Sequence, residues 1–213
     1  VGSEMCIRDR WEHSGLAELK WLPRLNDTRR RTNLTTVTRL GWNSLTEILD
    51  EGGLSYPEVS GDSLANEIDD MLCDLSTSES TLIHSDLRAD NLLFNTAGDG
   101  VMLVDWQGCS FGPSSFDITY HMIQSLSVDD RRKHESELLD YYVNSLEFFG
   151  HQITIDEVHK LYRSSILYSL SIACAVPLIN DVEGPRVKEL AFSMASRTLA
   201  ALEDHDIGFG QRG

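Results

Sequence analysis

Paired cysteines are missing from this chain. It has 213 residues and only four cysteines, and no two of them lie close together. This scatter argues against a disulfide framework, and it argues against a zinc ribbon, which needs closely spaced ligand pairs. A reducing cytoplasm is the simplest setting for such a chain. The four positions are Cys6, Cys73, Cys109 and Cys174.

A segment long enough to span a membrane is also missing. The longest uncharged, apolar-rich run covers residues 164–179 and contains four serines and Pro177. Because a spanning helix needs about 20 predominantly apolar residues, we expect a buried core helix here and no membrane partner. The N-terminus has no apolar stretch of the length that a signal peptide requires.

Basic residues are fewer than acidic ones, and one long segment has none. The net charge is −16, which argues against nucleic acid as a partner. Residues 44–87 contain eleven Asp and Glu and no Lys or Arg. Two interpretations stay open for this acidic segment. It is either a face that attracts a cationic substrate or a solvated helical surface that aids solubility.

The first ten residues show no periodicity that continues into the rest of the chain, which begins with Val1 rather than Met. We interpret residues 1–10 as an artefactual or disordered leader and expect the natural gene to be longer. Residues 11–213 are assigned to one domain, because their number fits one domain or part of a larger one.

Helical periodicity dominates the chain. A helix is expected over residues 11–22, a short one near 44–50 and another near 63–75. The stretch 24–40 is polar and basic, and its arginine run at 29–31 is interpreted as a solvated loop, with a substrate or phosphate contact as the alternative. Capping boxes at 127–130 and 154–157 open two long helices. Gly-Pro at 184–185 precedes a last one, expected to turn Val187, Leu190, Ala191 and Met194 inward.

Three short strand-like runs interrupt the helices, at residues 81–84, 92–94 and 101–104. The Gly-rich turn 95–100 joins the last two runs into a hairpin. The sequence therefore predicts an α+β fold, a mostly helical body with a small β-hairpin in its middle.

The hairpin region displays a set of oxygen-bearing side chains. Asp86 follows the first strand in a loop, Asn91 precedes the second strand, and Asp105 ends the third. Antiparallel pairing would bring Asn91 and Asp105 to the same end of the hairpin. Their oxygens suit Mg²⁺ that also binds phosphates, and Asp86 could accept a proton from a hydroxyl nucleophile. Protein kinases transfer phosphoryl groups with this combination of an Asp, an Asn and a second Asp.

Three stretches together resemble the aminoglycoside phosphotransferase and choline kinase-like family, and most of all its bacterial and ecdysteroid-kinase-like members. They are His-Ser-Asp-Leu-Arg-Ala-Asp-Asn-Leu-Leu-Phe at 84–94, Val-Met-Leu-Val-Asp-Trp-Gln at 101–107 and Gly-Pro-Ser-Ser-Phe-Asp at 112–117. The likeness is sharp over residues 80–120 and diffuse elsewhere. It implies a kinase-like fold that moves the γ-phosphate of ATP, with Mg²⁺, to the hydroxyl of a small molecule.

The resemblance gives each matching residue a role. Asp86 matches the catalytic base of the family. Asn91 and Asp105 match the Mg²⁺ ligands, which hold the nucleotide through the metal. His84 matches a histidine that braces the catalytic loop, and Asp117 matches a structural carboxylate that helps to hold it.

Three further positions are less clear. Arg88 stands where kinases often place a cation near the transferred phosphate, and a surface salt bridge to Asp86 or Asp90 is an equal alternative. Ser85 replaces the usual glycine, a change expected to have little effect. Gln107 stands where many members have an acid, which puts an extra metal contact there in doubt.

The features of an N-terminal kinase lobe are missing before His84. Such a lobe carries a phosphate-covering Gly-rich loop and a strand lysine paired with a helix glutamate. The only lysine before His84 is Lys20, in a helical pattern, and no Gly-x-Gly-x-x-Gly occurs there. We therefore expect this chain to be the C-terminal, catalytic lobe of a kinase-like protein, inactive by itself.

Three functions compete. The first is an ATP- and Mg²⁺-dependent phosphotransferase acting on a small-molecule alcohol, in the full-length protein. The second is a non-catalytic kinase-like binding module. The third is a metal-dependent phosphohydrolase using His84, Asp86 and Asp105, ranked lowest because the other histidines form no metal-type pair. The acidic balance is compatible with a cationic aminoglycoside or choline-like acceptor but does not select one.

Overall fold

The computed structural model describes residues 19–97, 100–179 and 184–209. Its body is helical and carries two very small antiparallel sheets, so the predicted α+β class is confirmed. The helices are α2 (Thr28–Glu51), α3 (Gly61–Leu75), α4 (Ser115–Ser125), α5 (Val128–Phe148), α6 (Ile155–Ile179) and α7 (Pro185–Asp204).

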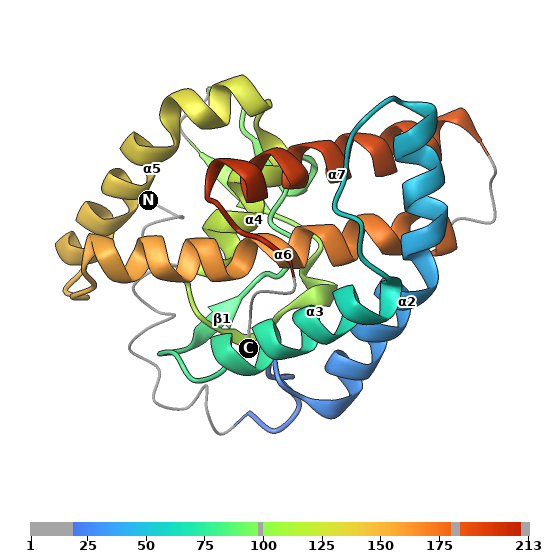
Figure 1. Ribbon diagram of the computed structural model, residues 1–213. Coiled ribbons are helices and arrows are strands. Elements are labelled where there is room, and N and C mark those ends of the chain that lie inside the picture. The colour runs from blue at the N-terminus through green and yellow to red at the C-terminus, as the bar shows by residue number, and fades with distance from the viewer. Residues whose placement is uncertain (1–18, 98–99, 180–183, 210–213) are drawn as a thin grey trace.

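Helix α6 is the centre of the fold. Figure 1 shows it running through the middle of the molecule, with α7 along one side of it and α3 on the other. Its inward residues follow the predicted helical spacing and are fully buried: Val158, Tyr162, Ile166 and Leu170. Length and composition alone would let residues 155–178 cross a membrane, but 67% of the most apolar window is buried inside the protein. The prediction of a core helix is confirmed, but the prediction that no segment is long enough to span a membrane is wrong, because the helix extends beyond the uncharged run 164–179.

Helix α2 corrects the sequence prediction. Residues 29–31 were expected to lie in a loop and 44–50 in a short helix, yet one helix of 24 residues runs from Thr28 to Glu51. Its buried face includes Leu34, Thr38, Gly41 and Leu45 at helical spacing. Two of these residues are not apolar, so the periodicity is weak in the sequence. The helix expected over 11–22 lies mostly outside the described residues, and 19–22 form a turn.

Gly41 allows α2 to lie directly on α6. A Cβ atom added at Gly41 would stand 1.9 Å from the carbonyl oxygen of Cys174 in α6. No side chain fits at such a distance, so the two backbones are in contact at this crossing. The contact fixes the direction in which α2 leaves the core.

The predicted helix starts are confirmed. The Ser127 hydroxyl accepts the Asp130 N–H at 3.1 Å at the start of α5. At the start of α6 the Thr154 hydroxyl accepts the Glu157 N–H at 3.2 Å, and Glu157 accepts the Thr154 N–H at 2.9 Å, which completes a capping box. In α7 one residue expected to point inward does not: Leu190 is 41% exposed.

A partly buried carboxylate joins the last three helices. Glu135 of α5 accepts hydrogen bonds from Arg131 and from the Tyr162 hydroxyl, both at 2.6 Å, and pairs with His205 at 2.8 Å. Burial raises the pKa of Glu135, but these three donors outweigh it and lower the pKa to about 2. The network ties α5 and α6 to the residue that follows α7.

The strands form two separate pairs. β2 (Leu92–Phe94) and β3 (Val101–Leu103) make the predicted hairpin, with Leu92 opposite Leu103. β1 (Thr81–Ile83) pairs instead with β4 (Ser110–Gly112), which was not predicted. β4 has three residues, two of them Ser and Gly, so its sequence carries no strand pattern.

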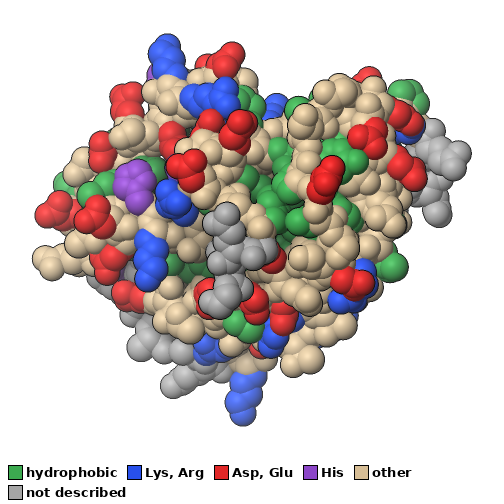
Figure 2. Space-filling model, viewed as in Figure 1, with side chains coloured by type: hydrophobic (Ala, Val, Ile, Leu, Met, Phe, Trp, Pro, Cys, Tyr) green, Lys and Arg blue, Asp and Glu red, His purple; other side chains and the backbone are tan. Residues whose placement is uncertain are grey.

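The acidic segment 44–87 forms mainly surface. Several of its acids pair with bases on other helices, such as Asp69 with Arg31, Asp62 with Arg39 and Glu51 with Lys188. Figure 2 shows acidic side chains spread over the face in view, beside a hollow lined by hydrophobic side chains. This distribution favours the interpretation of a solvated surface.

Candidate active site

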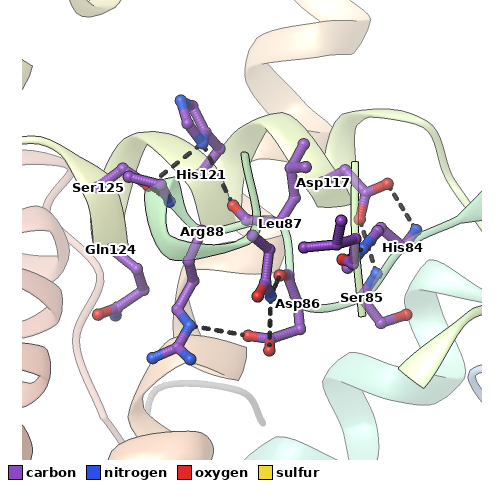
Figure 3. Close-up of polar contacts among 12 residues, drawn as sticks. His84, Ser85, Asp86, Leu87, Arg88, Asp117, His121, Gln124 and Ser125 are labelled. Carbon is purple, nitrogen blue, oxygen red and sulfur yellow. Dashed lines mark hydrogen bonds and ion pairs between the residues drawn. The ribbon is translucent and has the colours of Figure 1, made fainter. Parts of the chain in front are cut away.

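Helix α4 positions the loop between β1 and β2 through hydrogen bonds. Asp117, in the first turn of α4, is 4% exposed and accepts the backbone N–H groups of His84 at 2.7 Å and Ser85 at 2.8 Å (Figure 3). Two hydrogen bonds to one buried carboxylate fix the start of the loop, because each is charge-assisted.

His84 connects the two strand pairs. Its ring is fully buried, and Nε2 donates to the carbonyl oxygen of Val104 at 2.8 Å, just beyond β3. The ring also packs on Trp106, with centroids 4.7 Å apart. His84 therefore fixes the end of β1 against the end of β3 and does not face the cavity described below.

Ser85 has a left-handed backbone, with φ of 68°. Its hydroxyl lies 2.8 Å from that of Ser110 in β4, and its carbonyl oxygen accepts the Tyr168 hydroxyl at 3.3 Å. A residue with a Cβ pays about 1–2 kcal/mol for this conformation, and glycine does not. The geometry thus gives a physical reason for glycine here, and the expectation that serine has little effect is wrong for the backbone.

Asp86 is oriented by two neighbours. The amide nitrogen of Asn91 donates to its carboxylate at 3.1 Å and to its carbonyl oxygen at 2.8 Å. Arg88 Nε lies 3.2 Å from the other carboxylate oxygen (Figure 3). Two roles were left open for Arg88. The structure shows the ion pair with Asp86, and the phosphate contact stays a prediction. The Asp86 side chain is 34% exposed.

Helix α4 also holds the second half of the loop. The Ser125 hydroxyl accepts the Ala89 N–H at 2.9 Å, and His121 Nδ1 donates to the carbonyl oxygen of Leu87 at 3.3 Å (Figure 3). Burial lowers the pKa of His121, so the ring is neutral at pH 7. The loop is therefore positioned by α4 at both ends.

The hairpin brings Asn91 and Asp105 to one end, as its register requires. The Val104 N–H donates to the Asn91 carbonyl oxygen at 3.0 Å, which places Asp105 at the next position. Asp105 has a left-handed backbone, with φ of 64°, and is exposed.

These two residues fit Mg²⁺. Asn91 uses its amide nitrogen on Asp86, so its amide oxygen is left for a cation. Within the described residues, the Asp105 carboxylate makes no hydrogen bond or ion pair. One carboxylate and one amide oxygen suit a Mg²⁺ ion that takes its remaining ligands from water and phosphates. In the described residues, no group of three or more His, Cys, Asp or Glu side chains is placed to hold a metal ion.

A cavity of about 780 Å³ opens beside the loop. Asp86 and Arg88 line it, and Asn91 and Asp105 do not. Its other walls come from residues within 21–34, which include the start of α2, from Gln107 and Gly108 just after Asp105, and from α4, α6 and α7. We call it the Asp86 cavity.

Two buried tyrosines, Tyr120 and Tyr168, line this cavity beside Asp86, and the sequence analysis did not single them out. Burial raises the pKa of Tyr120 well above its usual value, and the nearby Tyr168 and Asp86 raise it further. Burial likewise raises the pKa of Tyr168. Both phenols keep their protons at neutral pH and can donate hydrogen bonds. Tyr120 follows Asp117 by three residues on α4, a helical spacing that could have indicated a shared face.

The site residues lie within a region that matches a known family. Residues 55–152 match the ecdysteroid kinase-like family. The chain is also 33% identical over 86 residues to an uncharacterized kinase-like protein of Caenorhabditis elegans. That alignment covers 39% of this chain and 23% of the relative, so the chain spans about a quarter of the relative's length. The likeness to kinase-like proteins that was seen in the sequence is confirmed.

Proposed function

We propose that this chain carries the catalytic and metal-binding half of a phosphotransferase that moves the γ-phosphate of ATP to the hydroxyl of a small molecule. The observation that carries the proposal is the position of Asp86. Its carboxylate lines a cavity large enough for a small molecule, on a loop fixed by Asp117, with Asn91 and Asp105 outside that cavity.

Asp86 has the geometry of a general base. Its carboxylate is partly exposed to the cavity, so an acceptor hydroxyl can donate to it and pass on its proton as phosphoryl transfer proceeds. Asn91 keeps the carboxylate aimed at the cavity. Arg88, beside Asp86, can offset the charge on the phosphate oxygens.

Asn91 and Asp105 would hold Mg²⁺ on the other side of Asp86. When bound there, the ion would neutralise charge on the β- and γ-phosphates of ATP. The proposal divides the site in two: the nucleotide at the hairpin end and the acceptor in the Asp86 cavity.

The test is transfer of label from γ-labelled ATP into a mixed panel of small alcohols, using the complete gene product that contains this chain. Asp86→Asn should lower kcat by about 10²–10⁴-fold, the usual contribution of a general base. Asp90→Asn is the matched control, because Asp90 is an exposed carboxylate on the same loop. Unchanged transfer by Asp86→Asn would contradict the assignment. Binding of Mg²⁺-ATP without any transfer would favour the non-catalytic binding module.

A further inference from the structure

The Asp86 cavity is lined by more basic than acidic side chains, whereas the whole chain is strongly acidic. The net charge is −16, yet the cavity is lined by three arginines and only two carboxylates. One of the carboxylates is Asp86 itself. The other, Asp27, already accepts the Arg24 N–H at 2.8 Å. Of the eleven acidic residues in segment 44–87, only Asp86 lines the cavity.

The arginines of helix α2 divide into two kinds. Arg31 and Arg39, which do not line the cavity, pair with Asp69 and Asp62. Arg29 and Arg30 line it, and no carboxylate in the described part of the chain lies within ion-pair distance of either. Arg29 is exposed and Arg30 is partly buried, so a ligand in the cavity can reach both guanidinium groups. Their charges are not neutralised by a carboxylate of the described residues, and this contrast points to an anion that the cavity receives.

Arg30 is the more enclosed of the two. Its Nε is buried and makes no hydrogen bond within the described structure. Its charge and a side-chain hydrogen bond to the Tyr168 hydroxyl both oppose the rise in the pKa of that phenol. Tyr168 in turn donates to the Ser85 carbonyl oxygen, next to Asp86. Arg30 therefore lines the same cavity as Asp86, and Tyr168 contacts both Arg30 and the catalytic loop.

The walls that α6 and α7 contribute beyond Tyr168 are apolar. Ile172 and Val176 of α6 and Leu190 and Met194 of α7 line the cavity. Leu190 is 41% exposed, which is high for a leucine on a helix that packs into the core. A ligand body without charge would bury this surface favourably.

We propose that the acceptor is an alcohol with an apolar body and a negatively charged group, which Arg29 and Arg30 bind while its hydroxyl reaches Asp86. The proposal rests on the proposed function for the role of Asp86, but its charge preference is a property of the cavity alone. It reverses the cationic acceptor that the acidic composition allowed. The phosphates of ATP are the competing anion, because Arg88 and the residues just after Asp105, Gln107 and Gly108, also line the cavity, and the experiment below separates the two ligands.

The experiment compares three alkanols that differ only at one end: ω-hydroxydecanoate, decanediol and ω-aminodecanol. Their dissociation constants for this chain are measured by tryptophan fluorescence, since Trp21 lines the cavity, and by calorimetry. We expect the carboxylate to bind about tenfold more tightly than the diol, as one charge-assisted hydrogen bond contributes at least this factor. The ammonium compound should bind most weakly. Equal or tighter binding of the ammonium compound, or no binding of any of the three, would overturn the proposal.

Substitutions of three arginines test which residues cause the preference for the carboxylate ligand. Arg30→Gln should weaken binding of the carboxylate about tenfold and leave the diol unchanged. Arg29→Gln should act in the same direction, and its exposed position makes misfolding no explanation. Arg39→Gln, on the same helix but outside the cavity, should change nothing. If Arg30→Gln instead weakens Mg²⁺-ATP, and Mg²⁺-ATP displaces the carboxylate probe, the arginines bind nucleotide and the proposal fails. Preferential binding of the carboxylate with no phosphoryl transfer would refute the proposed function and leave this charge preference standing.

Discussion

The left-handed backbone at Ser85 makes an unusual prediction about two substitutions, Ser85→Gly and Ser85→Ala. Both remove the hydroxyl that lies 2.8 Å from the Ser110 hydroxyl, so both lose the same buried hydrogen bond. They differ only in one methyl group. At an ordinary position, alanine would be the more stabilising of the two, because glycine gains more freedom in the unfolded chain.

At Ser85 the order should be reversed. With φ of 68°, alanine keeps a strain of about 1–2 kcal/mol that glycine does not have. The unfolded-state advantage of alanine is about 0.4–1 kcal/mol, so glycine should be favoured by roughly 0.5–1 kcal/mol. Relative to wild type, alanine should cost about 1–2 kcal/mol, because it also leaves the buried Ser110 hydroxyl without this partner.

Denaturant unfolding of the two variants, followed by circular dichroism, measures this difference. A gap of this size corresponds to about 1–4 °C in Tm for a domain of this length. Equal slopes in the two unfolding curves would confirm that the variants unfold from the same state. Alanine equal to or more stable than glycine would refute the left-handed conformation and the account of why this position favours glycine.

Three further changes test other parts of the fold by the same unfolding measurement. Gly41→Ala should cost about 3 kcal/mol or more, because its Cβ would strike the Cys174 carbonyl oxygen of α6, and a variant as stable as wild type would contradict that crossing. Asp117→Asn should cost about 2–3 kcal/mol, since an amide cannot accept both loop N–H groups as the carboxylate does, and a cost under about 0.5 kcal/mol would contradict its role. Glu135 has its pKa lowered from 4.5 to about 2, so its contribution is complete above pH 4.5 and is lost as the pH falls toward 2. Glu135→Gln should therefore flatten the loss of stability between these two pH values.

Local patterns in the sequence predicted what is local in the structure. The capping boxes at Ser127 and Thr154 and the buried face of α6 depend on residues a few positions apart, and each is found as expected. The hairpin was also predictable, because its turn is rich in glycine and its strands are adjacent in sequence. The positions of Asn91 and Asp105 at one end of it follow from the same register.

Features that depend on distant residues were missed. Helix α2 packs through Thr38 and Gly41, and small or polar residues at a close helix crossing leave no apolar stripe to detect. The Asp86 cavity brings Arg30 of α2, Asp86 of the loop and Ile172 of α6 together, and no spacing in the sequence relates them. The arginines of 29–31 were therefore interpreted as solvated, although two of them face the cavity.

The central claim is that Asp86 takes the proton while Asn91 and Asp105 hold the metal. The most direct test is the rate of label transfer from γ-labelled ATP to the alcohol panel, measured as a function of Mg²⁺ concentration for wild type, Asp86→Asn and Asp105→Asn. Asp105→Asn should raise the Mg²⁺ concentration needed for half-maximal rate, because it removes the one carboxylate ligand. Asp86→Asn should lower the maximal rate about 10²–10⁴-fold at an unchanged Mg²⁺ requirement. Wild-type rates and the same Mg²⁺ dependence in both variants would contradict the account.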